Sequence, residues 1–364
     1  MPPSTQNRIE GLLLGTAVGD ALGLPMEGMK ASTIKTLGWA KNLRHRFIFG
    51  RGMWSDDTEH SIMLAQALLA SEGDEKIFTR KFAWELRWWL FGLPAGVGMA
   101  TARAMIKLWL GFSPEHSGVF SAGNGSAMRT AVIAAYFPDD AGKRFQLVQA
   151  QTQVTHSDPK ALIASLAVTE VAACLLKSKS PPSPEKILSI LKLPNNMACF
   201  TWDIKWNEII SHIENGWSEN APLSKLISSF GRKPENGISG YAYHTVPAVI
   251  YTGVQYNWDF KKVITAIIKA GGDTDSTAAI AGALCGAYGG TASIPRDWIA
   301  PISEWPTGMN ELRVLAQALH KHQPLRVRSH WSPMLLLRNL LFLVIVIFHG
   351  FSRLLPTTLR RSKP

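Results

Sequence analysis

Cysteine is scarce in this sequence, with three residues in 364. Cys174, Cys199 and Cys285 lie far apart, and none belongs to a Cys-x-x-Cys pair, which leaves zinc-ribbon and thioredoxin-like proteins without support. An odd, sparse cysteine count is typical of a reducing compartment, so we expect a cytoplasmic protein. The N-terminal segment MPPSTQNRIEG has neither a basic nor an apolar stretch, so a cleaved signal peptide is not expected.

Acidic residues are also few, 27 against 38 Lys and Arg, which gives a net charge of +11. Most of this excess lies at the C-terminus, because residues 325–364 contain seven basic residues and no acidic one. Residues 1–324 therefore carry only +4. They contain no Lys/Arg run and no zinc-finger spacing, so we do not expect a nucleic-acid partner. A hydrophobic content of 46% with 18% charged residues excludes a mainly disordered or collagen-like chain.

Long segments that alternate apolar and polar residues are missing, which disfavours a large sheet. Apolar residues instead recur at helical spacing in seven segments: 8–24, 59–71, 78–91, 99–110, 160–176, 275–288 and 311–320. The segment 244–254 is rich in β-branched residues, but its surroundings are helical. The sequence predicts an all-α, compact, single multi-helix domain over residues 1–324, followed by a basic and hydrophobic tail over 325–364.

Glycine recurs every four residues in the first helix, at Gly11, Gly15, Gly19 and Gly23. Glycine lowers helix propensity, so four of them on one ridge make sense if another backbone approaches closely there. The segment carries Glu10 and is too short to span a bilayer, so we predict a buried helix of a soluble domain. The segment 275–288 is a second helix dense in small residues.

Two acidic clusters each open a predicted helix. The first is Ser55-Asp56-Asp57-Thr58, and the second, Asp273-Thr274-Asp275-Ser276, follows two glycines. Ser, Asp and Thr at a helix start can be simple caps. Adjacent carboxylates repel one another unless a cation lies between them, so two matching clusters favour a metal site. Ligands that are all oxygen suit Mg²⁺ or Mn²⁺.

Three further features have two interpretations each. Glu27 lies in a turn after the glycine helix, where a glutamate is usually only exposed to solvent. The segment 123–129, GNGSAMR, is either an ordinary tight turn or a loop whose N–H groups bind phosphate or ribose oxygens. His156 is a candidate cap for the helix that begins near Pro159.

In this order, the motifs GDALGLPMEG, SDDT, GNGSAMR, Thr155-His156 and GGDTDSTAAIAGALCGAYGG resemble those of the ADP-ribosylglycohydrolase family. The resemblance extends from about residue 8 to about residue 320, and the paired SDDT and GGDTDST motifs are its specific part. It implies a compact all-α domain with two divalent cations, Mg²⁺ or Mn²⁺, in a cleft. The family often has Thr where this chain has Ser55 and Ser276, and a hydroxyl is present in both cases.

The resemblance also implies roles for individual residues. The metal ligands would be Ser55, Asp56, Asp57, Asp273, Asp275 and Ser276. The catalytic carboxylates would be Glu27 and Asp57, one of which takes the proton of the attacking water. The substrate would contact Gly123, Asn124, Gly125, Ser126, Met128 and His156.

The implied activity is hydrolysis of the glycosidic bond at the distal ribose, which removes ADP-ribose from a modified protein or other acceptor. One alternative is a protein that binds ADP-ribose or an ADP-ribosyltransferase and neutralises it without turnover. Another is a metal-dependent hydrolase of a different nucleotide.

The tail lies outside the resemblance. Its uninterrupted apolar run, 340–348, has nine residues, whereas a spanning helix needs about 20. Three alternatives stay open for residues 334–355: a marginal membrane anchor with Arg338 near its end, an interfacial helix held by basic flanks, and a terminal helix packed on the domain or on a partner.

Overall fold

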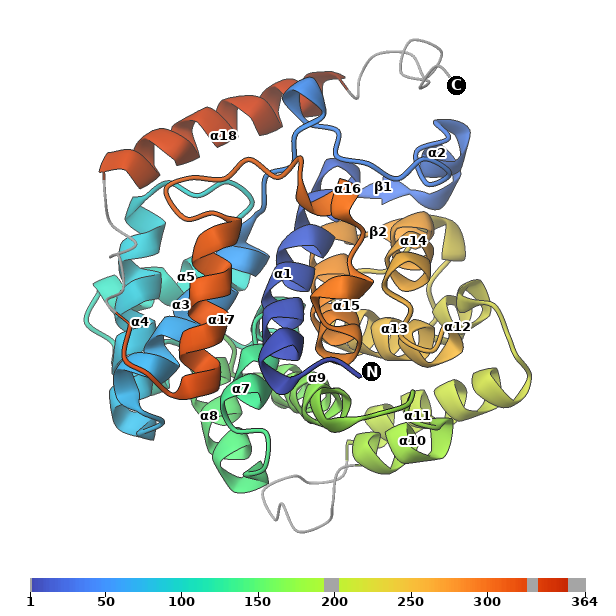
Figure 1. Cartoon of the computed structure of the whole chain (residues 1–364), viewed down its shortest axis with the longest axis horizontal. Coiled ribbons are helices and arrows are strands. Elements are labelled where there is room, and N and C mark those ends of the chain that lie inside the picture. The colour runs from blue at the N-terminus through green and yellow to red at the C-terminus, as the bar shows by residue number, and fades with distance from the viewer. Residues whose placement is uncertain (1, 193–202, 326–332, 353–364) are drawn as a thin grey trace.

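The computed structural model describes residues 2–192, 203–325 and 333–352, and these residues are almost entirely helical (Figure 1). Their α-helices are α1 Thr5–Gly23, α2 Ala31–Thr36, α3 Asp56–Ser71, α4 Glu75–Phe91, α5 Met99–Trp109, α6 Pro114–Ser117, α7 Ala131–Tyr136, α8 Ala141–Gln153, α9 Pro159–Lys177, α10 Pro184–Leu191, α11 Ile204–Ser218, α12 Leu223–Ser229, α13 Ala242–Gln255, α14 Phe260–Ala270, α15 Thr274–Gly289, α16 Arg296–Ile299, α17 Met309–Lys321 and α18 Pro333–Ser352. Short 3₁₀ turns are η1 Leu24–Met26, η2 Ile48–Gly50, η3 Asn124–Ser126, η4 Pro234–Asn236 and η5 Thr291–Ser293. The all-α prediction is confirmed, and 244–254 lies in helix α13.

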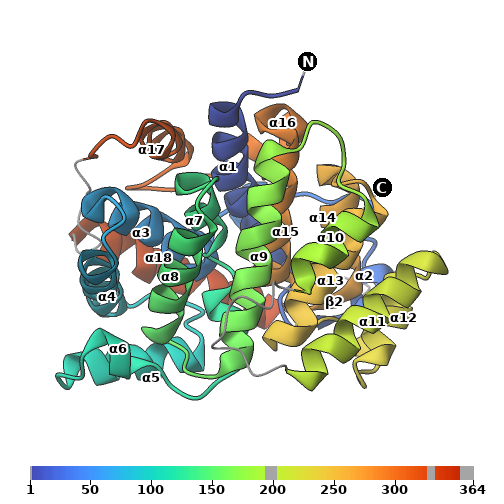
Figure 2. The same cartoon turned by 90° about the horizontal axis from the view of Figure 1, so that it is seen from below.

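The helices α1 and α15 lie side by side at the centre of the domain, and the other helices surround them (Figures 1 and 2). Both are buried along nearly their whole length. Their contact runs antiparallel, from Gly11 beside Gly286 to Gly19 beside Ala278. A Cβ atom at Gly19 would lie 2.0 Å from the carbonyl oxygen of Ala278, so only glycine allows this approach. The close backbone contact predicted from the glycine ridge is confirmed.

Among the described residues, three helices are long and apolar enough to cross a membrane by length and composition. The segments Thr5–Met26 and Pro159–Lys177 are 94% and 72% buried inside the domain, so both are core helices. The third, Pro333–Phe351, is only 22% buried. It forms α18, which lies across one edge of the molecule (Figure 1).

Two short strands link the segment after α1 to the start of α15. β1 (Met29–Lys30) pairs antiparallel with β2 (Gly271–Gly272), with Met29 opposite Gly272. Both glycines have positive φ, and a Cβ at Gly272 would lie 1.9 Å from the carbonyl oxygen of Ile238. The close approach at these glycines is therefore to the protein's own backbone, and it fixes the start of α15 beside the turn that follows α1.

Candidate active site

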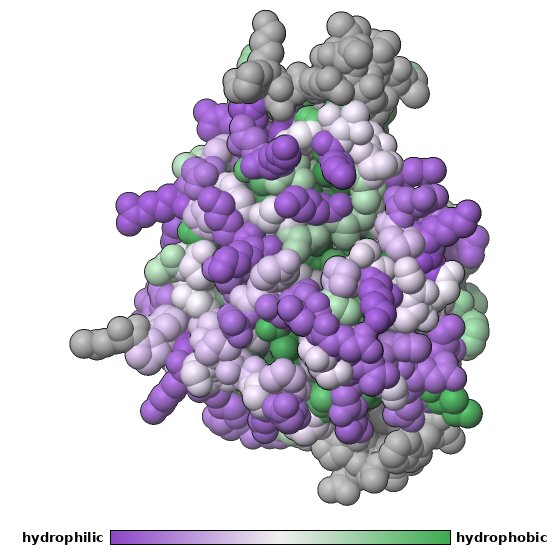
Figure 3. Space-filling view, turned by 90° about the vertical axis from the view of Figure 1, so that its right-hand side faces the viewer, coloured by the Kyte–Doolittle hydropathy of each residue, from purple (hydrophilic) through white to green (hydrophobic). Residues whose placement is uncertain are grey.

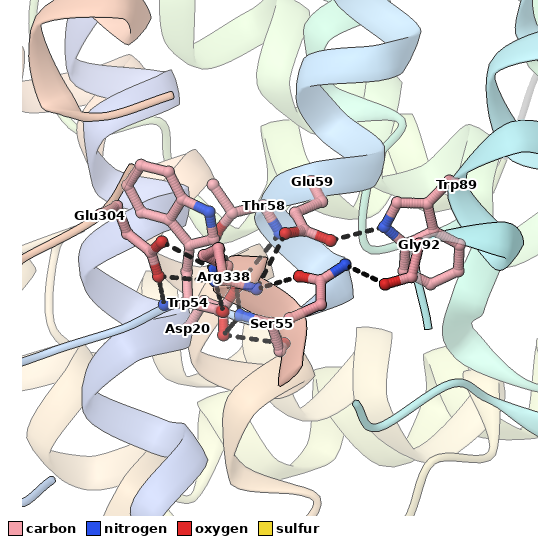
Figure 4. Close-up of polar contacts among 10 residues, drawn as sticks. Asp20, Trp54, Ser55, Thr58, Glu59, Trp89, Gly92, Glu304 and Arg338 are labelled. Atoms are coloured by element: carbon pink, nitrogen blue, oxygen red, sulfur yellow. Dashed lines mark hydrogen bonds and ion pairs between the residues drawn. The ribbon is translucent and has the colours of Figure 1, made fainter. Parts of the chain in front are cut away.

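The N-terminus of α3 is held by a carboxylate from α1. The two oxygens of Asp20 accept hydrogen bonds from the backbone N–H of Ser55 (3.0 Å) and of Thr58 (3.1 Å) and from both hydroxyls (2.9 and 2.6 Å) (Figure 4). The Ser55 side chain itself makes no cap hydrogen bond to its helix. Burial raises the pKa of Asp20 to about 6, although these hydrogen bonds act in the opposite direction. Because Asp20 caps α3, the acidic side chains of the first cluster are not needed as caps.

At the N-terminus of α15, too, the acidic residue of the cluster does not cap its own helix. Asp273 is the N-cap residue of α15, but its side chain makes no cap hydrogen bond to the helix. Its Oδ2 instead accepts a hydrogen bond of 2.8 Å from Nδ2 of Asn124. Capping, the simpler interpretation of both acidic clusters, therefore does not account for their carboxylates.

The two clusters meet in space, although they are more than 200 residues apart in the chain. The hydroxyl of Ser276 donates a 3.2 Å hydrogen bond to Oδ2 of Asp57, which is also 3.2 Å from Oγ of Ser55. The other oxygen of Asp57 and Oδ1 of Asp275 are buried and have no hydrogen-bond partner. An unpaired buried charge is costly, so two buried carboxylate oxygens without partners are expected either to be protonated or to bind a cation.

The electrostatics of the cluster agree with this geometry. Burial first, and then the neighbouring carboxylates of Asp20, Asp56 and Asp273, raise the pKa of Asp57 well above its usual value. Burial, Glu27, Asp273 and Asp57 do the same for Asp275. The carboxylates therefore lie close enough to repel one another, which is the situation that a bound divalent cation relieves.

Within the described residues, no three His, Cys, Asp or Glu side chains form a ligand group by themselves. The ligand sets predicted from the sequence also use the hydroxyls of Ser55 and Ser276, and both hydroxyls lie at Asp57. The oxygen-only chemistry and the two unpartnered carboxylate oxygens thus fit a hard cation such as Mg²⁺ or Mn²⁺.

Glu27 lies at the solvent side of this cluster. It follows the 3₁₀ turn η1, its side chain is exposed, and its charge raises the pKa of both Asp56 and Asp275. The backbone places it there because Gly28, at φ +72°, donates its N–H to the carbonyl of Gly272 at 2.7 Å. The turn glutamate therefore adjoins the acidic residues of both helices.

The loop GNGSAMR begins beside the second cluster. Asn124 is buried and joins Asp273 to Thr245 through its amide nitrogen (2.8 and 3.1 Å). The backbone at Gly123 and Gly125 passes so close to the His156 ring that a Cβ atom would lie 3.4 and 3.1 Å from it. Three of the predicted substrate-binding residues and His156 are thus brought together.

The remaining members of this loop face the interior. Ser126 is fully buried and donates to the carbonyl of Ala161, while Met128 is 3% exposed in the main core. His156 is buried, and burial together with the Arg129 charge lowers its pKa to about 3, so its ring is neutral. The sequence suggested His156 as the cap of α9, but this prediction is wrong. Asp158 caps the helix by accepting a hydrogen bond from the N–H of Lys160 at 2.9 Å.

Two residues that shape the site were missed as site residues from the sequence, Asp20 and Arg129. Arg129 is fully buried and donates to Gln151 (2.7 Å) and Thr155 (2.7 Å), directly behind His156. Asp20 lies in the motif GDALG and Arg129 in the motif GNGSAMR. Their position next to residues assigned to the site could therefore have identified them from the sequence.

Comparison with known proteins agrees with the geometry. The family model described as ADP-ribosylglycohydrolase matches residues 1–327. The chain is 27% identical to ADP-ribosylhydrolase ARH3 of Gallus gallus, over 88% of this chain and 94% of that protein. It is also 27% identical to ADP-ribosyl-[dinitrogen reductase] glycohydrolase of Rhodospirillum rubrum, over 82% and 92%. A solved structure, titled "ADP-ribosylglycohydrolase-related protein complex", superposes with a TM-score of 0.61 at 26% identity and covers 88% of this chain and 99% of that chain.

Proposed function

The chain belongs to the ADP-ribosylglycohydrolase family, and on that premise we propose that it is a metal-dependent hydrolase that removes ADP-ribose from a modified protein. The family and its named relatives support an ADP-ribosyl hydrolase. The metal-dependent mechanism is supported mainly by one observation. The acidic N-termini of α3 and α15 meet where the Ser276 hydroxyl donates a hydrogen bond to Asp57.

The residues that would hold the cations are Ser55, Asp56, Asp57, Asp273, Asp275 and Ser276. Two Mg²⁺ or Mn²⁺ ions bound there would polarise a water and the ribose hydroxyls of the substrate. The buried oxygens of Asp57 and Asp275 that lack hydrogen bonds support this assignment, because a cation would satisfy them.

Glu27 is the better candidate for the general base. Asp57 is fully buried and its Oδ2 already accepts from Ser276, whereas the Glu27 side chain is exposed beside the cluster. A base must lie within hydrogen-bond reach of the water from which it takes a proton. Cleavage of the glycosidic bond develops positive charge on the ribose, which the surrounding carboxylates stabilise.

The loop at 123–125 and His156 would orient the ADP-ribose. Asn124 links this loop to Asp273, so the substrate loop and a metal ligand share one hydrogen bond. His156 stays neutral because of its low pKa, so we assign it to positioning rather than to proton transfer. A reducing, cytoplasmic location remains the proposal that follows from the cysteine content.

Release of ADP-ribose from a panel of ADP-ribosylated proteins, with and without Mg²⁺ or Mn²⁺, tests the proposal. Asp56→Ala and Asp273→Ala should each abolish release and metal binding. Glu208→Ala, an exposed position on α11, is the control and should behave as wild type. Full activity in the double variant Asp56→Ala/Asp273→Ala, or release without any divalent cation, would contradict the mechanism, and binding of ADP-ribose without release would favour the neutraliser.

A further inference from the structure

The outward face of α18 is a long apolar surface without charge. Leu337, Leu341, Val344 and Phe348 follow one another along this face, and their side chains are 61%, 47%, 62% and 68% exposed. Arg338 is the one Asp, Glu, Lys or Arg residue in the helix. The face shown in Figure 3, on another side of the molecule, is mostly hydrophilic with small separate hydrophobic areas. The α18 face therefore differs from that face, although large apolar side chains are also exposed on α4 and α5, among them Trp84, Phe91 and Ile106.

Two polar residues of α18, Arg338 and Asn339, point inward. Arg338 is 2% exposed and forms ion pairs with Glu304 (2.7 Å) and Glu59 (3.1 Å), and it donates to the carbonyl of Trp54 at 2.8 Å (Figure 4). Asn339, fully buried, donates to the carbonyl of Gly92 at 2.7 Å. A surface helix of a soluble protein usually carries its charged side chains outward. In α18 the inward face combines Arg338 and Asn339 with the buried apolar side chains of Phe342 and Ile345, and the outward face is apolar as well.

We propose that α18 docks the protein on an anionic lipid bilayer. Its outward face enters the boundary between headgroups and acyl chains, while its inward face stays on the domain. The helix of 20 residues is about 30 Å long and lies parallel to the membrane plane in this arrangement. The helix lies beyond the family match, which ends at residue 327, so the surface is an addition to the shared domain.

The ion pairs of Arg338 favour docking over spanning. A spanning α18 would have to leave the domain, which would strand Glu59 and Glu304 in the interior without their cation. It would also carry Arg338 into the hydrocarbon layer, where a charged side chain is costly. Arg338 therefore does not lie at the membrane end of the helix, as a snorkelling residue would, but holds the helix on the protein.

The C-terminal end of α18 adjoins a basic hollow that suits lipid headgroups. His349 lies against Phe47, with ring centroids 5.3 Å apart, and lines a hollow of about 660 Å³ together with Arg44, Arg46 and Phe49. Phe49 is 96% exposed, and Nε of Arg46 is buried without a hydrogen-bond partner.

A guanidinium binds phosphate oxygens in a planar, forked geometry, and an exposed phenylalanine beside it can enter the interface. One acidic residue, Asp297, also lines this hollow. The sequence beyond α18 adds four basic residues and no acidic one within 353–364. This charge complements an anionic surface, where each basic residue near the membrane strengthens binding.

The test is co-sedimentation of the full chain with vesicles of phosphatidylcholine alone or with 30% phosphatidylglycerol (about a third anionic lipid, sufficient for a negative surface potential). We expect binding to the anionic vesicles that weakens as salt is raised. The variant Val344→Glu/Phe348→Glu should lower the bound fraction at least about tenfold, because it places two charges in the apolar boundary. Ile204→Glu, at a 75% exposed position on α11, is the matched control and should bind as wild type.

Four results would overturn the proposal. The first is no binding to anionic vesicles at low salt, and the second is equal binding by both variants. The third is a lipid-free dimer that Val344→Glu/Phe348→Glu dissolves, which would make the face a contact between two copies. The fourth is retention on vesicles through an alkaline carbonate wash, which would show a spanning helix. Release of ADP-ribose in solution is measured on the same variants and should not change, so failure of the docking proposal is distinguishable from failure of the proposed enzyme.

Discussion

Gly19→Ala offers a direct test of how the helix pair α1 and α15 supports the site. The new Cβ atom would lie 2.0 Å from the carbonyl oxygen of Ala278 and 2.5 Å from its carbonyl carbon. An ordinary contact starts at 3.4 Å, so the two backbones would have to separate by about 1.4 Å. Both are buried helix backbone, which cannot rotate out of the way as a side chain can.

The expected cost follows from two opposing effects. Alanine is a better helix former than glycine by about 1 kcal/mol. Overpacking a rigid core costs about 1–3 kcal/mol and occasionally more, and a contact this short belongs at the upper end. We therefore expect Gly19→Ala to lower the free energy of unfolding by about 2 kcal/mol or more, measured by urea denaturation with circular dichroism.

The effect should also reach the proposed metal site, because Gly19 directly precedes the Asp20 carboxylate that caps α3. Gly11→Ala is the matched control. Its Cβ would lie 2.5 Å from the carbonyl of Gly286, at the far end of the same helix pair. Both variants should lose stability, but only Gly19→Ala should weaken Mn²⁺ binding in a calorimetric titration. Wild-type stability of Gly19→Ala, or equal loss of Mn²⁺ affinity in both variants, would refute the reasoning.

Three further predictions concern the polar groups around the site. Asn124→Asp replaces the amide that donates to Asp273 with a second carboxylate, and metal titration should show about a 10- to 100-fold loss of affinity; unchanged affinity would contradict it. The His156 ring, whose pKa is lowered to about 3, should still be neutral at pH 5 by ¹⁵N NMR. In the unfolded chain this histidine takes up a proton below about pH 6.5, so the free energy of unfolding should fall as the pH drops from about 6.5 toward 3. A charged ring at pH 5 would show that the site is more open to water. Arg338→Met leaves two buried glutamates without their cation and should cost about 3–5 kcal/mol in urea unfolding, whereas a loss under about 1 kcal/mol would mean that the ion pairs are dispensable.

Local patterns in the sequence were sufficient to predict most of the helices and the close approach of another backbone to α1. The spacing of Gly11, Gly15, Gly19 and Gly23 predicts a close backbone approach because glycine has no Cβ, and that argument needs no partner to be known. The acidic clusters likewise predict a shared site, because adjacent carboxylates need a common counter-charge. The structure brings Asp57 and Ser276 together as this argument expects.

The partners of isolated polar residues could not be predicted. In the sequence, Asp20 is a polar residue in an otherwise apolar helix. Its role as a cap for α3 depends on Ser55, which is 35 positions away. Arg338 reads as an interruption in an apolar run, because Glu59 and Glu304 are distant in sequence. The cap of α9 is different, because Asp158 directly before Pro159 is a standard sequence signal for a helix N-cap, and the structure confirms that Asp158 caps the helix.

The pairing of α1 with α15 has a consequence for biosynthesis. The partner of the first helix is the segment Thr274–Gly289, so a nascent chain of 250 residues has exposed glycines along α1 and nothing to cover them. Contacts between such distant segments form slowly, and domains of this size are open to misfolding until they form. The acidic residues of both helix starts also come together only then, so an incomplete translation product lacks half of the site and should be unable to hydrolyse anything.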